Sequence, residues 1–223
     1  MLEFLMAGGW VMWPILILSL LAMAIILERF WTLRATSVLP PGLGWEVCQW
    51  AAKGKLDPAH VEALRDNSAL GALLAATLDV RHWPRHQIKE RVEDVGRHLS
   101  HRMERFLNTL GTIAAVSPLL GLLGTVFGMI RMFMSMLEFG VGDPNRLAGG
   151  IGEALVSTAA GLSVAIPALI FYRYFRGRVA EYVVEMEKQA IALLDTLEHA
   201  SPVVPTGTAR SETSDDPLGQ AQG

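Results

Sequence analysis

The chain has 223 residues, 51% of them hydrophobic, with a formal net charge of −3 and a positive mean hydropathy of +0.33. The basic residues of the segment 28–106 are offset by acidic residues, so the charge gives no support for a nucleic-acid partner. The single cysteine, Cys48, cannot form an internal disulfide.

Three stretches without any charged residue hold most of the apolar residues. They are Trp10–Leu27, Leu107–Ile130 and Ala154–Tyr172, with 18, 24 and 19 residues. Each is long enough to cross the hydrocarbon core of a bilayer. We therefore expect an all-α membrane protein with three transmembrane helices. The alternative is a soluble core of three buried helices, which would have to be uncharged on every face for about five turns.

The first stretch differs from a removable signal peptide, because its basic residues, Arg29 and Arg34, follow it rather than precede it. No Lys or Arg precedes this stretch, whereas the segment Glu28–Phe106 contains twelve. Basic residues collect on the cytoplasmic side of a membrane, so we expect the N-terminus outside and the large loop inside.

This orientation fixes the expected organisation along the whole chain. We expect a periplasmic N-terminus (1–9), span one (10–27), a cytoplasmic helical region (28–106), span two (107–130), a periplasmic hairpin (131–148), span three (149–172), a cytoplasmic helix (173–200) and a disordered tail (201–223).

The cytoplasmic region shows helix signals of its own. Asp57-Pro58 and Ser68 are typical of helix starts. From Ile88 apolar residues recur every three or four positions, and the stripe runs straight into span two with no Gly or Pro at the junction, which predicts one helix from Ile88 to Phe139. A similar stripe from Val179 to Leu197 predicts that span three also extends as a long helix into the cytoplasm.

Small residues are concentrated in spans two and three. Gly124 and Gly128 form a small-xxx-small pattern, which lets helix backbones approach closely in lipid. Two prolines each remove a backbone donor and can bend their helices. The candidate helix-packing residues are Gly121, Gly124, Gly128, Gly161, Pro118 and Pro167.

Polar side chains in these spans are the candidate functional residues. Glu153 is either a solvated acid at the outer headgroup level, near a helix N-terminus, or an acid inside a bundle that faces a polar lumen. Ser157 lies one turn further on the same face, beside Thr158, and Thr125 is the isolated hydroxyl of span two. A lone threonine in a span more often bonds to its own helix than lines a path, so both interpretations stay open.

The segments SPLLGLLGTVFGM and GGIGEALVSTAAGLSVAIPALIFYRYF resemble the ExbB/TolQ branch of the MotA/TolQ/ExbB proton-channel family. The resemblance covers roughly residues 113–178 and fits the three-span topology. It implies that Thr125, Glu153 and Thr158 line the inner, polar faces of spans two and three.

The resemblance also implies a function and partners. Proteins of the ExbB type form pentamers around a single-span partner, ExbD, and use the proton motive force to drive TonB-dependent outer-membrane transport. A TolQ-like role in the Tol-Pal envelope-maintenance system is the alternative. The segments AAVSPLLGLLGTVFGM and ALIFYRYFRGRV look more like the ExbB group. The sequence itself agrees with the need for a partner, because no span contains Asp, Lys or His and a single acid at one edge cannot pass protons across about 30 Å of hydrocarbon.

Other function classes fit less well. An intramembrane protease needs a nucleophile with its base, or two aspartates, at membrane depth. A transporter working alone usually shows repeated halves. A purely structural scaffold explains the packing residues but not the three polar residues together. We expect no enzyme activity, no catalytic residue, no cofactor and no metal.

Overall fold

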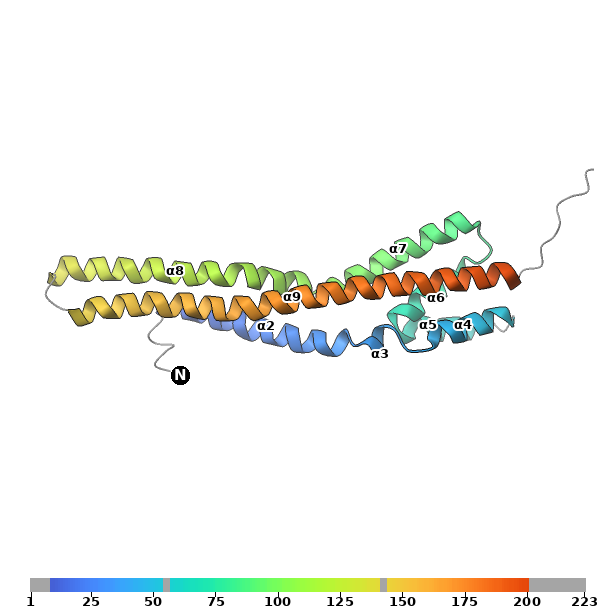
Figure 1. Ribbon diagram of the computed structural model, residues 1–223, viewed down its shortest axis with the longest axis horizontal. Helices are drawn as coiled ribbons and strands as arrows, with labels where there is room; N and C mark the ends of the chain where they lie inside the picture. Colours follow the sequence, from blue (N-terminus) through green and yellow to red (C-terminus); the bar gives the residue numbers. More distant parts are fainter. Residues whose placement is uncertain (1–8, 54–56, 141–143, 201–223) are drawn as a thin grey trace, which may run out of the picture.

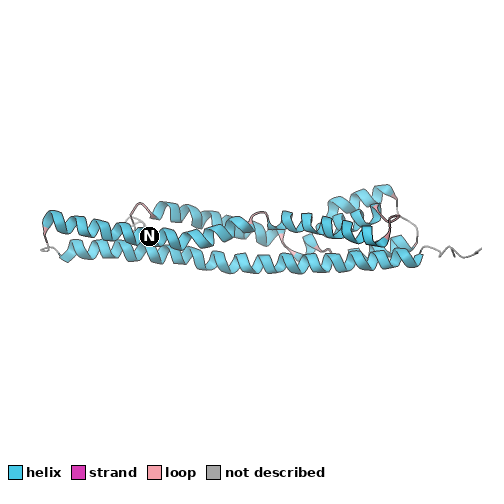
Figure 2. Cartoon of the chain, turned by 90° about the horizontal axis from the view of Figure 1, so that it is seen from above, coloured by secondary structure: helices cyan, strands magenta, loops and turns pink. Residues whose placement is uncertain are grey.

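The computed structural model describes residues 9–53, 57–140 and 144–200. Within these ranges every regular element is a helix, and Figure 2 draws no strand. The helices are α2 (Met12–Thr32), α3 (Ala35–Val38), α4 (Leu43–Ala52), α5 (Pro58–Asn67), α6 (Ala69–Asp79), α7 (Arg85–Glu104), α8 (Leu107–Phe139) and α9 (Pro144–Ala200). By length and composition, α2, α8 and α9 can each cross a membrane. The predicted all-α membrane fold is confirmed, while residues 1–8 and the predicted tail, 201–223, lie outside the described residues.

Helix α9 is the axis of the molecule. It runs without interruption for 57 residues, or about 85 Å at about 1.5 Å per residue. It contacts α2, α4, α6, α7 and α8, as Figure 1 shows along its length. Val179, Met186 and Leu193 of the predicted stripe are fully buried. The prediction that span three continues as a long helix is therefore confirmed.

Helix α8 lies antiparallel to α9, and the two form a hairpin that continues well beyond the start of α2 (Figure 1). The beginning of α2 therefore meets the sides of the hairpin rather than its tip. The Trp10 ring contacts the Phe127 ring edge to face, with 5.4 Å between the centroids.

At the other end, α6 is the centre of a helical core. Leu70, Leu73, Leu74 and Leu78 are almost fully buried, and α6 contacts α4, α5, α7 and α9. The Ser68 side chain accepts a hydrogen bond from the Gly71 amide at 3.0 Å, so the predicted cap is present. Helix α5 begins at Pro58 as expected, although the Asp57 side chain makes no cap hydrogen bond.

The predicted single helix from Ile88 to Phe139 is wrong, because α7 ends at Glu104 and α8 begins at Leu107. A side chain that is distant in sequence binds at this break. Arg29 of α2 is 4% exposed, and its Nη1 donates to the Met103 carbonyl at 2.9 Å, the acceptor that Leu107 N–H would use in a continuous helix. The Arg29 guanidinium also lies over the Phe106 ring, 5.0 Å from its centroid. The apolar stripe still faces inward, with Ile88, Val92, Leu99, Met103 and Leu110 all buried.

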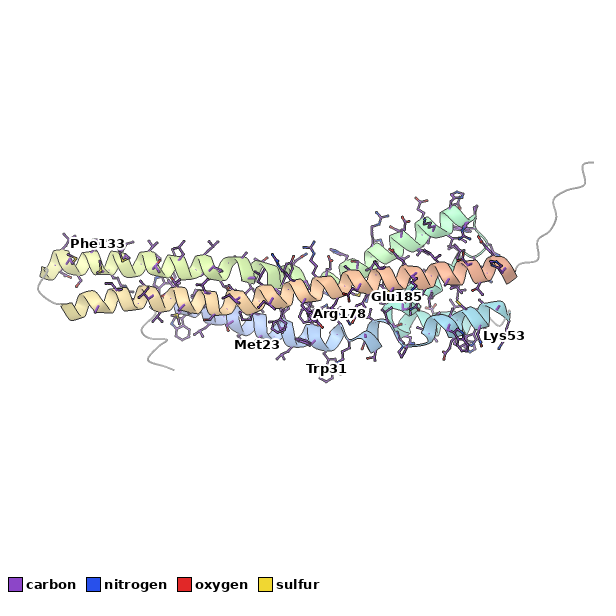
Figure 3. The ribbon with its side chains drawn as sticks, viewed as in Figure 1. Met23, Trp31, Lys53, Phe133, Arg178 and Glu185 are labelled. Carbon is purple, nitrogen blue, oxygen red and sulfur yellow. The ribbon has the colours of Figure 1, made fainter. Side chains whose placement is uncertain are left out.

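The outer surfaces of the membrane helices are apolar. Figure 3 shows Met23 and Trp31 pointing away from α2 and Phe133 pointing away from α8, and their side chains are 56%, 72% and 56% exposed. A soluble domain rarely leaves so large an apolar surface open to water. These surfaces suit contact with lipid or with other membrane helices.

Candidate functional site

The seam between α8 and α9 is built from glycines that let the two backbones touch. A Cβ added at Gly121 would lie 3.0 Å from the Ser157 carbonyl oxygen, and one at Gly161 would lie 2.5 Å from the Ser117 carbonyl oxygen. Real Cβ atoms essentially never lie under 3.0 Å from other heavy atoms. A side chain at Gly161 would therefore separate the helices.

The seam continues towards the hairpin tip. A Cβ at Gly124 would lie 2.3 Å from Ser157 Cβ, and one at Gly128 would lie 2.9 Å from Ala154 Cβ and 3.0 Å from the Gly150 carbonyl oxygen. The four candidate packing glycines thus lie in one intramolecular contact. Pro118 and Pro167 lie inside α8 and α9 without ending either helix.

The hydroxyl groups of the site differ in what they bind. Ser157 is fully buried in the seam, and its Oγ donates to the Glu153 carbonyl at 2.9 Å. Thr158 Oγ1 donates across the helices to the Gly121 carbonyl at 3.3 Å. Thr125 Oγ1 donates to the Leu122 carbonyl of its own helix at 2.6 Å. Thr158 thus bonds to the other helix, whereas Thr125 bonds to its own backbone, as an isolated threonine commonly does.

The register of α8 against α9 places Thr125 and Thr158 at similar positions along the length of the hairpin. Thr125 follows Gly124, which faces Ser157, and Gly121 faces Ser157 and Thr158. Thr125 and Thr158 are both half-buried, so neither hydroxyl is sealed in the seam. The structure brings the two threonines to neighbouring turns of facing helices without a hydrogen bond between them.

Glu153 lies one helical turn nearer the hairpin tip and is held by an ion pair. Arg131 Nη1 lies 2.8 Å from Glu153 Oε1 and 3.1 Å from Oε2. The Glu153 side chain is 18% exposed and that of Arg131 58% exposed. The acid therefore faces α8 and is paired with Arg131, and its location at the headgroup level or facing a polar lumen stays a prediction.

The turn that precedes α2 covers the same carboxylate. Gly9 has a positive φ of 67°, and a Cβ there would lie 2.0 Å from Glu153 Oε1. Glycine provides both the left-handed backbone and the space for the acid. Glu153 thus lies level with the start of α2, close to the turn that contains Gly9.

Sequence reasoning missed Arg131 and Gly9 as neighbours of Glu153. Arg131 directly follows the uncharged stretch of span two, as Glu153 directly precedes that of span three. Opposite charges at corresponding ends of two antiparallel helices are a signal that could have suggested the pair.

Chemically, the site offers one carboxylate and several hydroxyls along apolar helices. These groups can accept, hold or solvate a proton. In the part of the chain that the structure describes, no group of three or more His, Cys, Asp or Glu side chains could hold a metal ion.

Residues 65–188 match the MotA/TolQ/ExbB proton channel family. The chain is 36% identical over 176 residues to a putative biopolymer transport protein ExbB-like 1 of Synechocystis sp., covering 78% of this chain and 69% of that protein. It is 31% identical over 167 residues to the biopolymer transport protein exbB1 of Vibrio cholerae, covering 72% of each. A third similar protein is the biopolymer transport protein ExbB of Salmonella typhimurium, 38% identical over 96 residues, which are 43% of this chain and 38% of that protein.

Proposed function

Because the chain belongs to the MotA/TolQ/ExbB proton channel family, we propose that it is the ExbB-like subunit of a proton-driven motor in the bacterial inner membrane. With an ExbD-like single-span partner it uses the proton motive force to energise TonB-dependent transport at the outer membrane. Its N-terminus is periplasmic and its C-terminus cytoplasmic. The observation that carries the proposal is that Thr125 and Thr158 lie on neighbouring turns of the facing helices α8 and α9, with Glu153 about one helical turn nearer the hairpin tip.

The distribution of charge supports the need for a partner. The uncharged stretches of the three spans contain no acid, and Glu153 lies level with the start of α2. Protons that reach Glu153 still have to cross most of the roughly 30 Å hydrocarbon core. A partner helix with its own intramembrane acid would carry the middle of that path.

A face of small residues on α9 supports assembly with other helices. Gly152 is half-exposed, and Gly149, Ala159 and Ser163 are exposed. A Cβ at Gly149 or Gly152 would meet nothing within 4 Å. Lipid does not require small residues, whereas close helix contacts do. We propose that this face packs in a homo-oligomer, a pentamer by family resemblance, that surrounds the partner.

The test removes each hydroxyl while keeping the shape of the side chain. Thr158→Val and Thr125→Val are expected to abolish iron–siderophore uptake in a strain that lacks its native protein, while expression and oligomer assembly stay normal. Glu153→Gln is expected to reduce uptake less completely, because water can partly replace an acid at an edge position.

Thr112→Val is the matched control. Thr112 is an exposed threonine of α8 that also bonds to its own backbone, with its Oγ1 donating to the Asn108 carbonyl at 2.9 Å. This variant should keep full uptake. Normal uptake by both Thr125→Val and Thr158→Val would mean that their hydroxyls only bond to backbone, and the proposed path would be wrong.

The alternative TolQ-like role predicts a different phenotype. Complementation of an envelope-integrity defect, without recovery of siderophore uptake, would assign the chain to that role. The ExbB names of the three similar proteins support the uptake function instead.

A further inference from the structure

The ion pair between Arg131 and Glu153 joins the two helices of the hairpin at the outer end of the proposed path. One nitrogen, Arg131 Nη1, contacts both carboxylate oxygens, at 2.8 Å and 3.1 Å. Charge-assisted bonds of this kind are among the stronger hydrogen bonds in proteins. Among the described residues, Arg131 is the charged group that contacts Glu153.

The third wall around the carboxylate is the turn that leads into α2. Gly9 leaves no room for a side chain beside Glu153 Oε1, and Trp10 fixes the turn by its contact with Phe127 of α8. The acid is therefore enclosed by its own helix, by α8 and by the segment before α2. Its side chain is directed towards α8, although the half-exposed Gly152 beside it leaves space on another face of α9.

We propose that Arg131 is a positioning residue for Glu153. Its guanidinium holds the Glu153 carboxyl group turned towards α8, and the pair must open before another group can reach both carboxyl oxygens. The inference rests on the proposed function in one respect: if the proton path exists, this ion pair closes its outer end. The geometry of the pair can be tested without any transport assay.

The test uses dicyclohexylcarbodiimide, which reacts with protonated carboxyl groups in apolar surroundings. Intact membranes containing the assembled full-length protein are treated, and modification of Glu153 is measured by peptide mass spectrometry relative to Glu138, an exposed acid of α8. In the wild-type protein the ratio should be low. In Arg131→Gln it should rise about tenfold, because loss of the guanidinium removes the group that occupies both oxygens of a largely buried carboxyl and leaves them open to the reagent.

Arg131→Lys is the conservative control, since it keeps a positive charge that can reach the acid, and its ratio should stay near the wild-type value. A role limited to filling space would give similar ratios in the two variants, because Gln and Lys differ in charge far more than in bulk. Arg131→Leu gives a second measurement of charge removal if the Gln variant fails to accumulate. An unchanged ratio in the charge-removing variants, or equal rises in Gln and Lys, would overturn the proposal.

A transport measurement on the same membranes separates this inference from the proposed function. If the labelling ratio rises as expected, Arg131→Gln should also change proton-motive-force-dependent uptake while Arg131→Lys preserves it. If the labelling responds but uptake is insensitive to every change at Glu153, Thr125 and Thr158, the positioning role stands and the proposed path fails. If uptake depends on the threonines but the labelling never responds to Arg131, the path stands and the positioning role fails.

Discussion

At the residue scale, several glycines of the α8–α9 seam have no space for a side chain. At Gly161 a Cβ would lie 2.5 Å from a backbone oxygen and 3.0 Å from Gly121 Cα. Backbone atoms cannot rotate away as a flexible side chain can. The cost of a larger residue therefore falls on the helix separation itself.

Gly161→Ala should destabilise the protein by about 1–3 kcal/mol, the usual cost of overpacking. Gly177→Ala is the matched control in the same helix, because a Cβ there meets nothing within 4 Å. The control should be neutral or stabilising by up to about 1 kcal/mol, since alanine favours helix over glycine. Thermal unfolding in detergent, followed by tryptophan fluorescence, compares the two. Equal melting temperatures would show that the seam is less tight than these distances indicate.

At the element scale, Arg29 links α2 to the junction of α7 and α8. The guanidinium is bonded by its Nε to Glu28 at 2.7 Å and by its Nη1 to the Met103 carbonyl. It thus takes up a backbone acceptor where the two helices separate. Arg29, which follows the uncharged stretch of span one, is therefore buried between helices and is not a solvated charge at the membrane surface.

Arg29→Gln should lower the free energy of unfolding by about 1.5–3 kcal/mol, the contribution of a hydrogen bond to a charged group. Arg34→Gln is the control, because Arg34 is exposed. In the described part of the chain, its guanidinium lies over the Trp31 ring, 5.1 Å from the centroid, and makes no hydrogen bond to a backbone carbonyl. Arg34→Gln should change stability by less than about 0.5 kcal/mol. Chemical denaturation in a mild detergent measures both. Similar losses in the two variants would contradict a special role for the Met103 contact.

At the scale of the whole molecule, one end of the elongated bundle is apolar on its outside and the other end is not. The membrane part exposes side chains such as Phe133 and Met23, whereas Glu185 and Lys53 lie towards the far end (Figure 3). Arg85 joins α7 to α9 through Asp195 at 2.8 Å and through Glu198. The hydrogen bond to Asp195, and then the charge of Glu198, raise the pKa of Arg85, so its guanidinium stays charged at all physiological pH values.

Cysteines at Glu138 and Lys53 should therefore label from opposite sides of the inner membrane. Both positions are exposed, one near the hairpin tip and one at the end of α4. A membrane-impermeant maleimide should reach Glu138→Cys in intact spheroplasts but Lys53→Cys only after lysis. Labelling of both before lysis, or of Lys53→Cys alone, would contradict the proposed orientation. Gly142, which belongs to the predicted periplasmic hairpin, lies outside the described residues.

The sequence by itself determined the features that depend on neighbouring residues. Uncharged length identified three helices able to cross a membrane, and apolar spacing identified the buried faces of α7 and α9. Ser68 marked the start of α6 correctly, because a cap bond joins residues three positions apart. Small residues in both spans indicated close packing, although they did not indicate which helices would pair.

Only the tertiary structure decided the contacts between distant residues. Arg131 and Glu153 are 22 positions apart, and Arg29 and Met103 are 74 apart. No periodicity within one helix predicts which carbonyl or carboxylate a long arginine side chain will reach, because that depends on the register and rotation of a second helix. For this reason the helix break at Arg105 and Phe106, and the partner of the candidate acid, appeared only once the helices were packed together.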